Sequence, residues 1–157
     1  MRIERIRLHI DEAILQSRRS GCKRKQVGAV AIRDGRTIAS GYNGVLPGVN
    51  SKYGIDKHGE SQTVHAEANL VAYAAKYGIP LAGCDLYTTM EPCRKCAELL
   101  LQIGFGKVVY LDSYRKHDGL RLLTNSSIQV FRVELKEDKN KVSLMRIISS
   151  IIPEDAE

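Results

Sequence analysis

The sequence is poor in cysteine and in long hydrophobic runs, the features that mark disulfide-stabilised and membrane-spanning proteins. It contains only four cysteines in 157 residues, fewer than a small disulfide-stabilised scaffold would hold. It also lacks a long hydrophobic run, because its longest apolar stretches, residues 27–32 and 99–103, are far too short to span a bilayer. The first residues are rich in charge, so we do not expect a signal peptide there. We therefore expect a cytoplasmic protein without a membrane partner.

What is present is the composition of one folded domain. Hydrophobic residues make up 43% of the chain and charged residues 27%, which suits a sizeable core. Neither an internal repeat nor a linker divides residues 1–157, so we predict a single domain. The net charge of +6 favours an anionic partner, from one phosphate to a nucleic acid. The alternative is a charge that only keeps the protein in solution.

Apolar periodicity and turn residues predict alternating helices and strands. The predicted helices cover residues 3–17, 65–77, 93–103, 119–124 and 141–152. The predicted strands cover residues 27–32, 37–42, 84–89, 107–111 and 128–134. A hairpin turn is expected at Asp34-Gly35, and a long Gly-rich loop over residues 43–61. The alternation predicts an α/β fold in which one mixed sheet is covered by helices on both faces.

Four residues form the pattern with the most specific chemistry. His65 and Glu67 lie at the start of one predicted helix, and Cys93 and Cys96 at the start of the next. Because the cysteines are three residues apart, their sulfur atoms lie on one helix face, and the helix N-terminus favours thiolates. One imidazole and two thiolates make three zinc ligands, whereas a structural zinc site usually has four. The fourth position is then left for a water molecule, as in a catalytic site.

Glu67 is the predicted catalytic residue of this site. It follows the ligand His65 by two residues, so its carboxylate can reach the water without replacing it. Zinc lowers the pKa of that water towards neutrality, and Glu67 would take its proton and pass it to a ring nitrogen. A binding module that retains zinc only as a structural staple is the non-enzymatic alternative, but it has no need of such a carboxylate.

Each of these residues has an ordinary explanation when it is taken alone. A Cys-x-x-Cys pair can be a redox pair or a coincidence, a helical histidine usually belongs to the core or the surface, and a lone glutamate is usually solvated. Their combination at two successive helix starts disfavours these alternatives. Cys84 has no such partner, and we expect a buried structural thiol there.

The pairing of His65-Ala66-Glu67 with Pro92-Cys93-Arg94-Lys95-Cys96 matches the signature of zinc-dependent deaminases. Further matching stretches are residues 17–24, 26–30, 86–88 and 108–110, together with Gly41-Tyr42-Asn43-Gly44 and Tyr114-Arg115. On these stretches the chain resembles the deoxycytidylate (dCMP) deaminases of phage and bacterial type, within the cytidine deaminase superfamily. The resemblance implies a three-layer α/β/α fold and the conversion of dCMP and water to dUMP and ammonia. Many members are homohexamers that dCTP activates and dTTP inhibits, so these effectors, with Mg²⁺, are further expectations.

The resemblance also implies a set of substrate-binding residues, namely Arg24, Asn43, Ala66, Tyr114 and Arg115. Arg24 would contact the phosphate, and its alternative is a solvated charge in a basic loop. The Asn43 carboxamide can hydrogen-bond a sugar hydroxyl or a ring edge, unless the residue only supports a left-handed turn. Tyr114 can bind phosphate or cover the base, and Arg115 can hold phosphate or gate the pocket. For both, an ordinary exposed loop is the alternative.

One departure from the family pattern concerns the metal. Related enzymes often carry a second, structural zinc on the cysteine equivalent to Cys22 and on another cysteine in the loop after Gly44. This chain has no cysteine in that loop, and His58 is the only other soft ligand nearby. We therefore expect one catalytic zinc per chain and no second zinc.

A second departure concerns the substrate. Met90-Glu91-Pro92 is similar to the corresponding stretch of tRNA adenosine, guanine and riboflavin-pathway deaminases. The alternative function is accordingly a deaminase that acts on tRNA adenosine or on a free nucleoside or base. The long loop over residues 43–61 and the Gly-Tyr-Asn-Gly stretch favour a mononucleotide, so we do not expect a nucleic-acid partner.

Overall fold

Six short apolar segments form one mixed sheet in the computed structural model, which describes residues 2–49, 63–114, 116–135 and 142–147. The strands are β1 (Gly28–Arg33), β2 (Arg36–Tyr42), β3 (Asp85–Met90), β4 (Lys107–Asp112), β5 (Gln129–Leu135) and β6 (Val142–Ile147). Their order in the sheet is β2-β1-β3-β4-β5-β6. β1 runs antiparallel to both of its neighbours, while β3, β4 and β5 are parallel.

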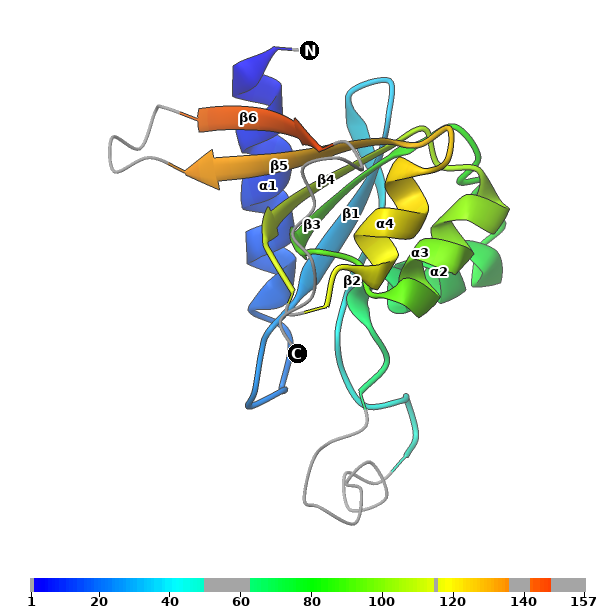
Figure 1. Ribbon diagram of the computed structural model, residues 1–157. Coiled ribbons are helices and arrows are strands. Elements are labelled where there is room, and N and C mark those ends of the chain that lie inside the picture. Colours follow the sequence, from blue (N-terminus) through cyan, green and yellow to red (C-terminus); the bar gives the residue numbers. More distant parts are fainter. Residues whose placement is uncertain (1, 50–62, 115, 136–141, 148–157) are drawn as a thin grey trace.

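Helices cover the sheet on both faces (Figure 1). They are α1 (Ile3–Ser17), α2 (Ala66–Lys76), α3 (Arg94–Ile103) and α4 (Asp118–Thr124). The apolar stripe of α1 packs on one face through Ile6, Ile10 and Ala13, all fully buried. The other three helices bury their apolar residues on the opposite face, in a separate and larger core. The predicted three-layer α/β/α architecture is therefore confirmed. Among the described residues, no helix combines the length and apolar character needed to cross a bilayer.

The predicted C-terminal helix over residues 141–152 is wrong where the structure describes it. Residues 142–147 form β6, which pairs antiparallel with β5 from Leu135↔Val142 to Val130↔Ile147. A short apolar segment carries too few residues for its periodicity to separate helix from strand. Without this partner β5 would leave a row of unpaired N–H and C=O groups at the sheet edge, and pairing with β6 satisfies them. Residues 141 and 148–152 lie outside the described residues.

The parallel strands determine where a site can form. Neighbouring parallel strands present their carboxyl ends at one edge of the sheet, and ligands of open α/β sheets bind beyond that edge. The residues that follow β3 lead into α3, and those that follow β4 lead into α4. Gly41 brings α2 to the same region, because a Cβ on this residue would lie only 2.3 Å from the carbonyl oxygen of Ala66. Only glycine therefore allows the first turn of α2 to rest directly on β2.

Candidate metal centre

Two predicted metal ligands occupy the N-cap positions of neighbouring helices. His65 is the N-cap of α2 and Cys93 is the N-cap of α3, and neither side chain makes a capping hydrogen bond. An N-cap residue is usually Ser, Thr, Asp or Asn, whose oxygen satisfies a backbone N–H of the first turn. Cys96 lies one turn into α3 and is buried. The choice of His and Cys at these positions therefore serves something other than helix capping.

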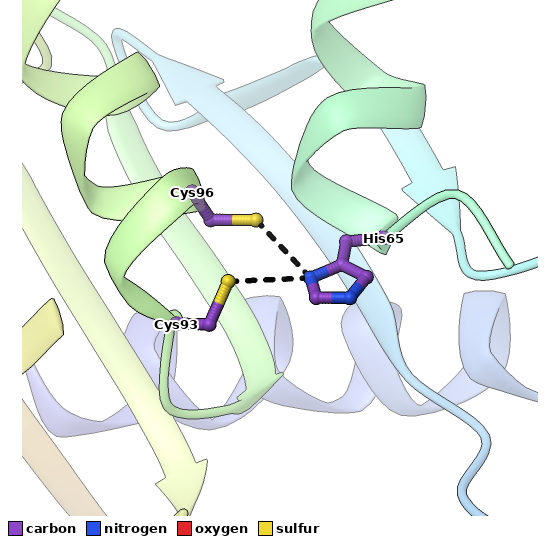
Figure 2. A group of neighbouring side chains, drawn as sticks. All are labelled: His65, Cys93 and Cys96. Carbon is purple, nitrogen blue, oxygen red and sulfur yellow. Dashed lines mark hydrogen bonds between the residues drawn. The ribbon is translucent and has the colours of Figure 1, made fainter. Parts of the chain in front are cut away.

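The three side chains converge although 28 and 31 residues separate the cysteines from the histidine. Figure 2 shows both sulfur atoms directed at the Nδ1 atom of His65. Each Sγ atom lies 3.4 Å from that nitrogen, and the potential ligand atoms of the three residues all lie within 4.8 Å of one another. Nitrogen and thiolate sulfur are the donors that zinc prefers, and three of them leave a coordination position open. The donor set of His65, Cys93 and Cys96 thus fits a catalytic zinc ion.

The electrostatics of the two thiols differ because they share a proton. Hydrogen bonding from Cys96, supported by His65, lowers the pKa of Cys93 to about 4. The same contact raises the pKa of Cys96 far above its usual range, since the Cys96 proton is held by the Cys93 thiolate. Hydrogen bonding to Cys93 also raises the pKa of His65. The lowered pKa of Cys93 favours the thiolate, which is the form in which cysteine binds a metal ion.

Glu67 faces this group from the first turn of α2. Its residue is only 3% exposed, and its Oε2 atom lies 3.5 Å from the Cys96 sulfur. Burial raises the pKa of the Glu67 carboxyl, which brings it closer to the range in which a general acid–base works at neutral pH. The structure thus places a carboxylate beside the ligand set, as the His-Ala-Glu spacing predicts.

A cavity of about 400 Å³ opens over these residues. It brings together four of the predicted substrate-binding residues, two of the metal ligands and Glu67, from five separate segments of the chain. Its lining includes Arg24, Asn43, His65, Ala66, Glu67, Cys93 and Tyr114. The lining also holds residues that were not predicted to contact substrate. They are Cys22, Lys25, Val27, Thr63, Met90 and Glu91.

Asn43 connects the cavity wall to the basic loop. Its Oδ1 atom accepts a hydrogen bond from the Val27 N–H at 2.7 Å, and its Nδ2 atom donates one to the Lys25 carbonyl at 2.8 Å. Asp34 is the one non-glycine residue with positive φ in the described part of the chain, so the left-handed turn proposed as the alternative for Asn43 is wrong. The carboxamide holds the segment that carries Arg24 against the end of β2.

The predicted residues differ in exposure, and two of them lie outside the described residues. Arg24 is exposed, and Tyr114 is 47% exposed, in the loop after β4. Arg115 and His58 lie outside the described residues. Cys84 is fully buried, and burial raises the pKa of its thiol, in agreement with a structural role. Within the described ranges His65, Cys93 and Cys96 are the one His/Cys/Asp/Glu group arranged to hold a metal ion.

Known proteins resemble this chain in both sequence and structure. The family model for the cytidine and deoxycytidylate deaminase zinc-binding region matches residues 3–112. ComE operon protein 2 of Bacillus subtilis is 37% identical over 76% of this chain, and the match spans 66% of that protein. Deoxycytidylate deaminase of Enterobacteria phage T4 is 29% identical, over 83% of this chain and 90% of the phage protein. The dCMP deaminase of cyanophage S-TIM5, solved in complex with dCMP and dUMP, matches with a TM-score of 0.77 and 31% identity, over 84% of this chain and 98% of that chain.

Proposed function

The chain belongs to the cytidine and deoxycytidylate deaminase family, and on that premise we propose that it hydrolyses dCMP to dUMP and ammonia. The observation that carries this proposal is a zinc-type ligand cluster that opens, through His65 and Cys93, into a cavity also lined by the buried Glu67 and by Arg24. The ligands and the glutamate suit hydrolytic deamination of a base. The arginine suits a substrate with a phosphate. Phage dCMP deaminases among the relatives support the same substrate.

His65, Cys93 and Cys96 would hold the zinc ion. When bound, the metal supplies Lewis-acid activation of the water that attacks the base. Glu67 takes a proton from that water and delivers it to the ring nitrogen as the water oxygen bonds to the ring carbon. It then moves the remaining hydroxyl proton to the exocyclic amino group, so that the carbon–nitrogen bond breaks and ammonia leaves. The burial of Glu67 keeps bulk water away from this transfer and raises the pKa of the carboxyl so that it can both accept and return the proton.

The wall of the cavity would bind the nucleotide. Arg24 contacts the phosphate with Tyr114 beside it in the lining, and the family resemblance assigns a phosphate-binding or gating role to Arg115 as well. Asn43, whose carboxamide also holds the basic loop, hydrogen-bonds the sugar or the base edge, and Ala66 contacts the base at the start of α2. Lys25 also lines the cavity, where the Asp112 carboxylate pairs with its ammonium at 2.7 Å. These contacts favour a charged mononucleotide over a free nucleoside.

A substrate panel tests the proposal directly. Ammonia release would be measured at fixed ionic strength from dCMP, deoxycytidine, dCTP, 5-methyl-dCMP and a tRNA anticodon stem-loop. We expect dCMP to give the highest kcat/KM. Equal or better turnover of deoxycytidine or of the stem-loop would replace the dCMP proposal with the nucleoside or tRNA alternative. Preference for 5-methyl-dCMP would keep the reaction and change the substrate.

Arg24→Ala should lower kcat/KM for dCMP by about ten- to hundredfold, because one charge-assisted hydrogen bond contributes on the order of 1.5–3 kcal/mol. Slow turnover of deoxycytidine, which has no phosphate, should stay unchanged. Arg18→Ala is the matched control, since Arg18 is an exposed arginine that does not line the cavity. A similar loss in both variants would assign the effect to net charge and contradict a direct phosphate contact.

We further propose the homohexamer and the dCTP and dTTP effectors, with Mg²⁺, that the family resemblance implies. Exposed apolar side chains support contacts between copies, namely Leu8 and Leu15 on α1 and Tyr73 and Tyr77 at α2. The net charge of +6 supports the binding of anionic effectors. A nucleotide substrate supports a cytoplasmic location.

A further inference from the structure

Glu91 is a buried carboxylate that the deamination chemistry does not use. It follows β3 and precedes Pro92 and Cys93, and its side chain is 0% exposed. Its backbone N–H donates to the Asp112 carbonyl at 2.8 Å, which extends the pairing of β3 with β4 by one step. A carboxylate without water is costly unless charge and hydrogen bonds compensate for its desolvation. Its partners therefore identify what it holds in place.

Those partners lie in the loop between β4 and α4. His117 Nδ1 lies 3.0 Å from each Glu91 oxygen, and the Tyr114 backbone N–H donates to Oε2 at 3.2 Å. The His117 side chain is mostly buried, and the residue is the N-cap of α4. One carboxylate thus holds both ends of the segment from Tyr114 to His117. The connection bridges 23 and 26 residues of sequence.

The start of α4 is also pressed against the metal-binding loop. A Cβ on Gly119 would lie 2.1 Å from the Pro92 carbonyl oxygen and 2.7 Å from the carbonyl carbon of Cys93, so only glycine fits there. Glu91 and Gly119 therefore attach the same loop and helix to the segment that carries Cys93. Tyr114, at the other end of this anchored loop, is one of the residues that line the cavity.

We infer that Glu91 and His117 form a clamp that positions Tyr114 at the substrate cavity. This inference rests on the proposed function, because it assigns Tyr114 to the binding of the same nucleotide. The Tyr114 N–H is anchored on Glu91 while the residue as a whole remains 47% exposed, an arrangement that leaves it accessible to a ligand in the cavity. Holding the loop before the substrate arrives removes part of the ordering cost from binding. Glu91 itself lines the cavity and His117 does not, so His117 is the positioning residue whose effect must pass through the loop and Tyr114.

A double-mutant cycle tests whether the clamp acts through Tyr114. His117→Ala should lower kcat/KM for dCMP by about tenfold, which is the lower end of what one charged hydrogen bond contributes. Most of this loss should be a rise in KM. In a Tyr114→Ala background the same substitution should cost almost nothing, because the group that it positions is absent. His117→Asn, which keeps an N–H donor near the position of Nδ1, should restore most of the activity. Full additivity of the two alanine substitutions would overturn the inference.

A second measurement does not depend on turnover. The chain contains no tryptophan, so Tyr114→Trp creates a single fluorescent reporter at the cavity. Adding His117→Ala should increase acrylamide quenching of that tryptophan, and His117→Asn in its place should not. The matched control is His9→Ala. His9 is also a buried histidine, 2.9 Å from the Glu12 carboxylate, but it lies on α1 on the opposite face of the sheet.

The outcomes of these experiments are separable. Greater quenching with His117→Ala but not with His9→Ala supports the clamp, provided that zinc content and Tm match those of the reporter protein. Equal quenching in all variants overturns it. If the wild-type protein does not deaminate dCMP, the proposed function fails, while the quenching experiment still reports whether Glu91 and His117 order the loop.

Discussion

Glu67→Gln should retain zinc and lose nearly all deamination of dCMP. Glutamine preserves the size of the buried side chain, but it cannot take a proton from water or return one to the base. Positioned general acid–base catalysis alone contributes roughly 10²–10⁴-fold to rate, so a loss of at least this size is expected in kcat. Metal content would be measured on the same preparations that are used for ammonia release.

The control for this substitution is Glu98→Gln. Glu98 lies on the exposed side of α3 and contacts Arg94 at 3.0 Å, so the variant removes a carboxylate of equal charge outside the cavity. It should keep near wild-type turnover. Near-full activity of Glu67→Gln would contradict the assigned proton transfer. If the Glu67→Gln protein instead loses zinc, Glu67 supports the metal, and the experiment gives no support to its catalytic role.

Cys96→Ala should lose zinc, activity and stability together. Cys96 supplies one of three converging donor atoms, and two donors bind zinc far more weakly than three. A ligand present at a thousand times its dissociation constant stabilises the native state by about 4 kcal/mol. For a domain of this size that corresponds to a fall in Tm of roughly 10 °C. Metal analysis and thermal unfolding with and without a chelator measure both effects.

Two other cysteines provide the controls. Cys84→Ala removes a buried thiol remote from the ligand set, so it should keep zinc although it leaves a small cavity. Cys22→Ala should also keep one zinc per chain, the stoichiometry expected of the wild type. A wild-type value near two that falls to one in Cys22→Ala would establish the second, structural zinc that the loop sequence argues against.

The metal ligands could be predicted because their information is local. His65 with Glu67, and Cys93 with Cys96, are each separated by two or three residues, and each pair lies at a helix start. Spacing within one helix turn determines which side chains share a face, so no knowledge of the fold was needed to group them. The cluster itself forms only in the folded protein. There the two helix starts meet, although Cys93 and Cys96 are 28 and 31 residues from His65 in sequence.

Other features depend on partners that are distant in sequence. Nothing local in Met90-Glu91-Pro92 indicates that Glu91 pairs with His117, because the loop that meets it arrives from the next parallel strand. The pairing of the Asn43 carboxamide with Val27 and Lys25 is invisible for the same reason. The segment 142–147 lacks a decisive period of its own and became a strand because β5 offered it an edge.

The sequence by itself therefore determined the order of elements up to β5, the ligand set and the deaminase chemistry, all of which rest on periodicity and short spacings. Only the tertiary structure decided the strand at the C-terminal end of the described chain, the clamp on Tyr114 and the meeting of Arg24 with the metal ligands in one cavity. The physical reason is the same in each case. Backbone preference and side-chain spacing act within a few residues, whereas the satisfaction of a strand edge or a buried carboxylate depends on which distant segment the fold places beside it.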